Sequence, residues 1–251
     1  MAYIRPTQDA HWYTADGKPC HVVPNVKGGG LRKTTMRDAR KLHLLPSVTS
    51  ILKVYPRPNL EAWKSEQLLI SALTTPRIPG EGDKELVTRI LLSAGEHAHR
   101  AARVGSLVHR DLHRYWKNGW APRTPQGKRA AADIGAWIHV KDWVVQGSEL
   151  TVADSDAGYA GTVDLWGHDF VADYKFRAKP AVYITDCVQL WAYRAAMKQW
   201  AAALVSLIGD PVTGEIAKFH IWTPDDEARA RVIWSACFCL WRDLKGWGRG
   251  E

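Results

Sequence analysis

The spacing of hydrophobic residues changes once along the chain, near Gly147. Before it, apolar side chains from Asp83 to Asn118 recur about every 3.6 residues, which predicts one or two helices there. After it, apolar and polar residues alternate, which predicts strands. Further helices are expected at 46–53, 59–75, 126–145, 182–200 and 224–247, and strands at 149–153, 159–166, 170–176, 202–208 and 216–222. Strands joined by a crossover helix imply an α/β fold: a mixed β-sheet flanked by helices, after a helical N-terminal region.

The first 45 residues have a different pattern. The runs His11–Tyr13 and His21–Val23 flank a turn at Asp16-Gly17, which is typical of a β-hairpin, and three glycines follow as a flexible loop. We therefore expect an N-terminal hairpin and basic loop over 1–45. One larger domain is expected over 46–251, with its helical part at 46–147 and its sheet core at 148–251.

Composition limits the class of protein. The 251 residues are 46% hydrophobic and 24% charged with only 4 Cys, which excludes a disordered chain and a disulfide scaffold. A formal charge of +8 favours a polyanionic partner. The N-terminus lacks the apolar run of a secretory signal, and the longest uncharged apolar stretches, Ala201–Gly209 and Val232–Trp241, are shorter than the roughly 20 residues that span a bilayer. We expect a soluble cytoplasmic protein without a membrane partner.

The segment from Gly158 to Lys175 contains candidate chemistry. If Leu165 pairs with Phe170 across a turn, Asp164 and Asp173 lie diagonally on one face of a hairpin, with Lys175 further along it and an apolar face behind. Diagonal neighbours are roughly 7–8 Å apart, so both carboxylates could bind one hard cation. With an ammonium beside them they suit phosphodiester hydrolysis. The same triplet is also typical of a surface salt-bridged hairpin.

Four short motifs occur in one order. Gly161-Thr-Val-Asp164 and Asp173-Tyr-Lys175 resemble two motifs of the PD-(D/E)XK nuclease superfamily, in the branch of RecB-like, Cas4-like and mitochondrial genome-maintenance exonucleases. That branch also has a Gly-x-x-x-His motif, matched by Gly105 to His109, and a Gln-x-x-x-Tyr motif, matched by Gln189 to Tyr193. Residues 46–52 are similar to phage exonuclease-like members. The resemblance spans about 46–200 and implies a restriction-endonuclease-like fold.

The resemblance also implies roles for these residues. It implies a DNA exonuclease dependent on Mg²⁺ or Mn²⁺ that acts on DNA ends or single strands in phage or host DNA processing, recombination or repair, in the host cytoplasm if phage-encoded. Lys175 would be the catalytic lysine. The implied metal ligands are His109, Asp164, Asp173 and the backbone carbonyl of Tyr174. The residues expected to support the site or contact DNA are Ser47, Gly105, Arg110, Glu149, Arg177, Gln189 and Tyr193.

Several readings stay open. Glu149 equally suits an exposed edge strand, and Ser47 an ordinary helix N-cap. His109 and His113 are spaced for zinc, but Arg110 stands where such enzymes need Glu. The cysteine spacing does not fit an iron–sulfur cluster, so none is expected. A structure-specific endonuclease and a catalytically silent DNA-binding subunit are the alternative functions, and the sequence makes no prediction of oligomeric state.

Overall fold

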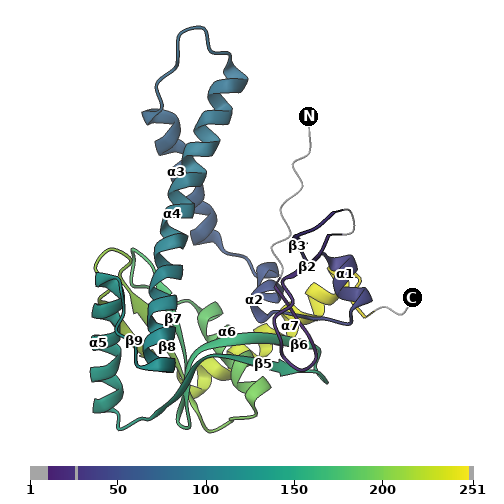
Figure 1. The fold of residues 1–251 in the computed structure, drawn as a ribbon, viewed down its shortest axis with the longest axis vertical. Coiled ribbons are helices and arrows are strands. Elements are labelled where there is room, and N and C mark those ends of the chain that lie inside the picture. Colours follow the sequence, from purple (N-terminus) through teal and green to yellow (C-terminus); the bar gives the residue numbers. More distant parts are fainter. Residues whose placement is uncertain (1–10, 26–27, 249–251) are drawn as a thin grey trace.

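A five-stranded mixed sheet forms the centre of the computed structural model, which describes residues 11–25 and 28–248, with the backbone alone for 97–102 (Figure 1). Its strands, in spatial order, are β5 (Val145–Asp154), β6 (Tyr159–Gly167), β7 (Phe170–Phe176), β8 (Ala203–Gly209) and β9 (Ile216–Ile221). Only β7 and β8 are parallel, and helix α6 (Ile184–Met197) connects them. The α/β fold expected from the sequence is confirmed.

Helices cover both faces of this sheet. Helices α4 (Asp83–Asn118) and α5 (Pro125–Val140) bury Leu112 and Ile134 with Phe170 on one face. On the other face, α6 and α7 (Pro224–Lys245) enclose a second apolar cluster that includes Val171 of β7. The sequence predicted that one face of the sheet is apolar and the other carries the polar candidate residues. This is wrong in part, because the face that carries Asp173 also buries an apolar cluster that includes Val171.

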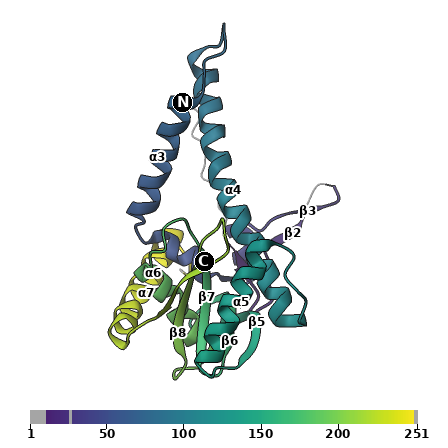
Figure 2. The same ribbon diagram turned by 90° about the vertical axis from the view of Figure 1, so that its left-hand side faces the viewer.

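Two helices form an arm that projects from the sheet (Figures 1 and 2). Helix α3 (Pro58–Thr74) and the first half of α4 pack side by side, and α4 is one continuous helix of 36 residues. It ends at Gly119, which takes the left-handed conformation with φ +68°. Smaller helices are α1 (Met36–Lys41), α2 (Val48–Ile51) and the 3₁₀ turn η1 (Leu52–Val54). None of the described helices combines the length and apolar character needed to cross a membrane.

The N-terminal hairpin prediction is correct next to the turn and wrong further out. Tyr13 pairs antiparallel with Pro19 across the turn at Gly17, and the Cys20 N–H donates to the Trp12 carbonyl at 2.8 Å. The longer pairings differ, because β1 (Trp12–Tyr13) pairs with β4 (Leu45–Pro46), and β2 (Val22–Pro24) pairs with β3 (Leu31–Lys33). The reason is the burial of Trp12, which is fully enclosed and lies with its ring centroid 6.4 Å from that of Trp241 and 5.2 Å from that of Trp247. This aromatic cluster joins β1 to the end of α7.

Candidate functional site

Strands β6 and β7 separate beyond their turn, and two carboxylates lie where they part. The strands pair only at Leu165 with Ala172 and Trp166 with Val171. One further step in this register brings Asp164 opposite Asp173, so the predicted diagonal arrangement is wrong by two residues. An even shift keeps both carboxylates on the same face. Strand β6 reaches Gly167 before turning, and only glycine fits there, since a Cβ would lie 2.3 Å from the Val144 carbonyl oxygen.

Asp164 takes the place of a backbone partner in the gap between the strands. Its Oδ2 accepts a hydrogen bond of 2.8 Å from the backbone N–H of Tyr174, and the residue is 8% exposed. The backbone carbonyl of Asp164 itself accepts from the Ser148 hydroxyl at 2.7 Å, which links Asp164 to β5. The carboxylate is therefore fixed by main-chain contacts rather than by its rotamer alone.

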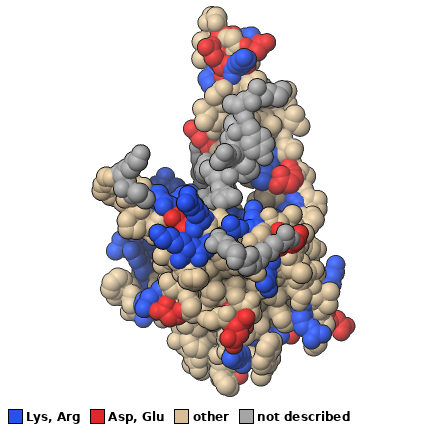
Figure 3. Space-filling model, turned by 90° about the vertical axis from the view of Figure 1, so that its right-hand side faces the viewer, with Lys and Arg blue, Asp and Glu red and all other residues tan. Residues whose placement is uncertain are grey.

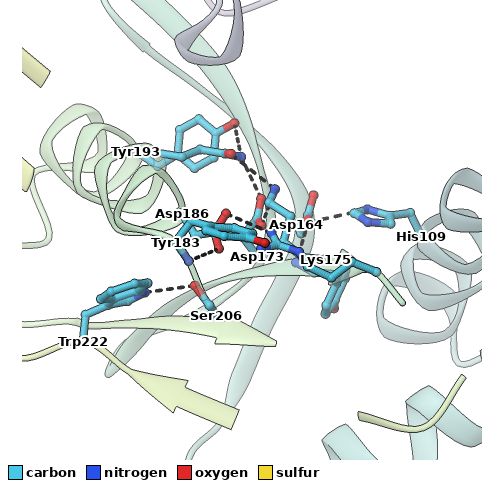
Figure 4. A network of polar contacts seen from close by, with 12 residues as sticks. His109, Asp164, Asp173, Lys175, Tyr183, Asp186, Tyr193, Ser206 and Trp222 are labelled. Carbon is cyan, nitrogen blue, oxygen red and sulfur yellow. Dashed lines mark hydrogen bonds and ion pairs between the residues drawn. The ribbon is translucent and has the colours of Figure 1, made fainter. Parts of the chain in front are cut away.

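Asp173 belongs to a hydrogen-bonded network with helix α6 (Figure 4). Its Oδ2 lies 2.5 Å from Lys175 Nζ, and its Oδ1 accepts from Gln189 Nε2 at 2.7 Å. Gln189 also donates to the Tyr193 hydroxyl at 3.1 Å and accepts from Lys175 at 3.3 Å. Gly161 makes room for this network, since a Cβ there would lie 2.4 Å from the Tyr193 ring. The Gly161 and Tyr193 positions of two separate motifs therefore meet.

A second group of ligand-type atoms faces Asp164 from α4 and β5. His109 Nδ1 lies 3.5 Å from Asp164 Oδ2, and its ring stands edge-on to Tyr174 with 5.3 Å between centroids. Potential ligand atoms of His109, Glu149 and Asp164 all lie within 4.8 Å of one another. Asp173 is outside this group of three but lines the same cavity of about 350 Å³. The compact group thus contains Glu149 where the sequence suggested Asp173.

Glu149 has an unusual backbone. Its φ is +55°, and it is the one non-glycine residue within a described strand whose φ is positive. A side chain in the left-handed region costs about 1–2 kcal/mol, and such strain is often found at functional sites. The Glu149 carboxylate lies near Asp164 and lines the cavity, which an ordinary exposed edge residue would not do.

The charges of the group shift each other's titration. Although burial opposes it, Asp164 raises the pKa of His109 to about 9, and in turn, against burial, His109 lowers the pKa of Asp164. Burial and then the Asp164 carboxylate raise the pKa of Glu149 to about 7. Against the effect of burial, Asp173 raises the pKa of Lys175, which therefore stays an ammonium. Burial raises the pKa of Asp173 even though Lys175 opposes this.

The residues present fit a divalent cation. Two carboxylates and an imidazole are a donor set that both Mg²⁺ and Mn²⁺ accept. Burial and then the nearby Asp164 carboxylate raise the pKa of Glu149, and a cation between the two carboxylates would remove their repulsion.

Three further residues that the sequence suggested lie in different surroundings: Ser47, Gly105 and Arg110. Ser47 lines the cavity, and its hydroxyl caps α2 by accepting from the Ser50 N–H at 3.0 Å. Gly105 lies one turn before His109, and no described atom lies within 4 Å of a Cβ built there. Arg110 is exposed.

Arg177 is partly buried and bonded to other residues of the protein. It donates to Asp186 Oδ1 at 3.0 Å and to the Ala181 carbonyl at 2.9 Å, and lies over the Tyr183 ring at 4.9 Å. These contacts fix the loop between β7 and α6, so the guanidinium supports the site from behind.

Sequence reasoning missed one side of the cavity. His11, Tyr13 and His21 line it, and the Tyr13 hydroxyl lies 3.0 Å from Thr162 Oγ1. These residues reach the site because β1 pairs with β4. The only sequence signal was the run of polar aromatic residues, which a hairpin explains equally well.

Comparisons with known proteins find similarity among solved structures alone, and it is distant. No family model and no curated protein matches the chain. Among solved structures, a crystal structure of a "Putative exonuclease" from Eubacterium rectale matches 60% of this chain and 69% of that chain, with 13% identity and a TM-score of 0.41. A likeness of this size identifies no family.

Proposed function

We propose that this protein is a metal-dependent deoxyribonuclease of the PD-(D/E)XK type, and within that class an exonuclease acting on DNA ends or single strands. One observation carries the proposal. The ligand-type atoms of His109, Glu149 and Asp164 lie within 4.8 Å, and the Asp173–Lys175 ion pair lines the same cavity. Carboxylates, imidazole and a fixed ammonium are the groups that metal-assisted phosphodiester hydrolysis requires.

Different residues of the cavity would have different roles in this reaction. His109, Glu149 and Asp164 would hold the cation, with Asp173 beside them. When bound, Mg²⁺ or Mn²⁺ supplies charge neutralisation at the phosphate and makes water more acidic. Lys175 keeps its proton because of Asp173, so it serves to stabilise negative charge that develops on the phosphate, rather than as a base. Gln189 fixes both partners of that ion pair.

The charge of the molecule suits a polyanion. The chain carries a formal charge of +8, and Lys and Arg side chains gather below the arm on the face drawn in Figure 3. Exposed Arg110 follows His109 on α4, where it would contact a phosphate. Gly105 leaves room one turn away, so a nucleic-acid backbone could approach the imidazole closely.

Incubation with end-labelled single-stranded, blunt duplex and covalently closed circular DNA tests the proposal. Each substrate is combined with Mg²⁺, Mn²⁺ or EDTA, beside Asp173→Ala and Lys175→Ala. We expect loss of linear DNA only, abolished by EDTA and by both substitutions. Cutting of closed circles would indicate an endonuclease instead. Binding without cutting under either metal would indicate a silent DNA-binding subunit.

A further inference from the structure

A second cavity lies along the edge strand, next to the candidate metal site. It has a volume of about 340 Å³, within the range of about 300–1,000 Å³ typical of small-molecule sites. Residues 146–151 of β5 form one side of it, and the end of α4 and Trp166 of β6 form the rest. Glu149 lines both cavities, so the second cavity begins where the candidate metal site ends.

The lining combines aromatic rings with groups that bind polar edges and phosphates. Trp116 and Trp166 supply two indoles, Lys117 an ammonium and Gln146 an amide. The Trp166 ring lies directly on the β5 backbone, since a Cβ at Gly147 would be 2.8 Å from its Nε1. Glycine at 147 is therefore what allows the indole to form a flat wall here.

One face of α4 runs from the metal site to this cavity. His109, His113 and Trp116 are spaced by four and then three residues, so they follow one stripe of the helix. His113 Nδ1 lies 3.4 Å from the Ser148 hydroxyl, which holds the stripe against β5 between the two cavities. Arg110, Arg114 and Lys117 form a parallel basic stripe beside it.

We propose that this cavity binds an unpaired nucleobase of a single-stranded nucleic acid, from a nucleotide adjacent to the phosphate at the metal site. The inference rests on the proposed function and specifies its substrate. Base stacking on aromatic side chains tolerates any base, and Lys117 would pair with the neighbouring phosphate. A base inside a duplex is already stacked and paired, and it would have to leave the helix to enter. The cavity therefore selects single strands.

Binding of matched oligonucleotides tests the base site directly. Fluorescence anisotropy would compare a labelled oligo-dT strand with an abasic strand of equal length, in EDTA and in Ca²⁺ at constant ionic strength. Wild-type protein should bind the dT strand about 10-fold or more tighter, because stacking contributes about 1–3 kcal/mol per base and about 1.4 kcal/mol is tenfold. Trp116→Ala and Trp166→Ala should lose this preference while binding the abasic strand as wild type does.

Control variants separate stacking from folding and from charge. Trp120→Ala changes an exposed tryptophan two residues beyond α4 that does not line the cavity, and it should keep the preference. Trp116→Phe and Trp166→Phe retain an aromatic ring and should keep the preference for the dT strand. They replace the alanine variants in the test if those fail to fold. Lys117→Ala, at an exposed residue, should weaken binding of both strands equally.

The outcomes separate this inference from the proposed function. Equal wild-type affinity for the dT and abasic strands in both buffers, or tighter binding of a duplex, would overturn the base site. Base-dependent binding without hydrolysis under Mg²⁺ or Mn²⁺ would keep the site and remove the nuclease. Metal-dependent hydrolysis without any base preference would keep the nuclease and remove the base site.

Discussion

The two sides of the candidate site differ in how many of their polar side chains bond to one another. On the β7–α6 side, Asp173, Lys175, Gln189 and Tyr193 bond to one another, and Asp173 is 2% exposed. On the α4–β5 side, His109 and Glu149 are only partly buried, and Glu149 has strained backbone geometry. Asp164 lies between them and contacts both β7 and His109.

This difference indicates separate tasks. The β7–α6 side is preorganised, because Gln189 is hydrogen-bonded to both Asp173 and Lys175, which form an ion pair with each other. On the α4–β5 side, burial and then the neighbouring Asp164 carboxylate raise the pKa of Glu149, although His109 opposes this. A cation would complete this side. The following predictions test this division.

Asp164→Asn should have the largest effect, because Asp164 belongs to both sides. The amide keeps an oxygen for the Tyr174 N–H but loses the charge that binds a cation and pairs with His109. We expect cleavage to fall about 10³-fold or more and Mn²⁺ binding to weaken strongly, as measured by gel assay and calorimetry. Asp156→Asn, at an exposed turn, is the matched control and should change neither.

Gln189→Leu should damage only the β7–α6 side. The substitution leaves Asp173 Oδ1 without its donor, and removing such an orienting contact typically costs about 10- to 100-fold in activity. Mn²⁺ affinity should change less than activity. Tyr193→Phe removes only an acceptor from Gln189 and should cost under about tenfold. A larger loss from Tyr193→Phe than from Gln189→Leu would contradict this ranking.

Two substitutions at Glu149 separate strain from ligation. Glu149→Gly relieves the positive φ and should stabilise the metal-free protein by about 1 kcal/mol, or about 2–4 °C in Tm. Glu149→Gln keeps the strained backbone, so it should stabilise the metal-free protein less than Glu149→Gly does. Both should weaken Mn²⁺ binding about tenfold or more. An unchanged Mn²⁺ affinity in both variants would remove Glu149 from the site.

The metal-free protein should become less stable as pH rises from about 5 to 9. The pKa of His109 is about 9 folded against 6.5 unfolded, and that of Glu149 is about 7 against 4.5. Both are raised by folding, so their stabilising effect is complete below the unfolded values and is lost through the folded ones. Because Mn²⁺ displaces these protons, its increase in Tm should be larger at pH 8 than at pH 6, in thermal melts with and without EDTA.

The sequence predicted the local elements well and the distant pairings poorly. Strand 170–176 was predicted to the residue, and α3 to within one residue at each end, because alternation and proline act locally. The partner of β1 lies over thirty residues away in β4 and is selected by burial of Trp12, which no local pattern reveals. The predicted β6–β7 register was wrong by two residues, and both registers place the same residues on each face, so alternation alone could not separate them.

The candidate site followed the same rule. Asp164, Asp173, Lys175 and Gln189 come from short motifs and meet in the structure. Glu149 joins them through a left-handed backbone conformation that its residue type does not favour, so the sequence could not separate it from an edge residue. Arg177 is of a residue type that often contacts DNA, but in the structure it donates to Asp186 of α6. The sequence near Arg177 does not reveal this pairing.

The aromatic cluster of Trp12, Trp241 and Trp247 makes the cavity sensitive to the far end of the chain. Trp12 is followed directly by Tyr13, whose hydroxyl contacts Thr162 two residues before Asp164. Shortening α7 before Trp241 would remove two of the three rings and release β1 from beneath. We expect such a truncation to alter the cavity through Tyr13 while every candidate ligand of the cation stays in the chain.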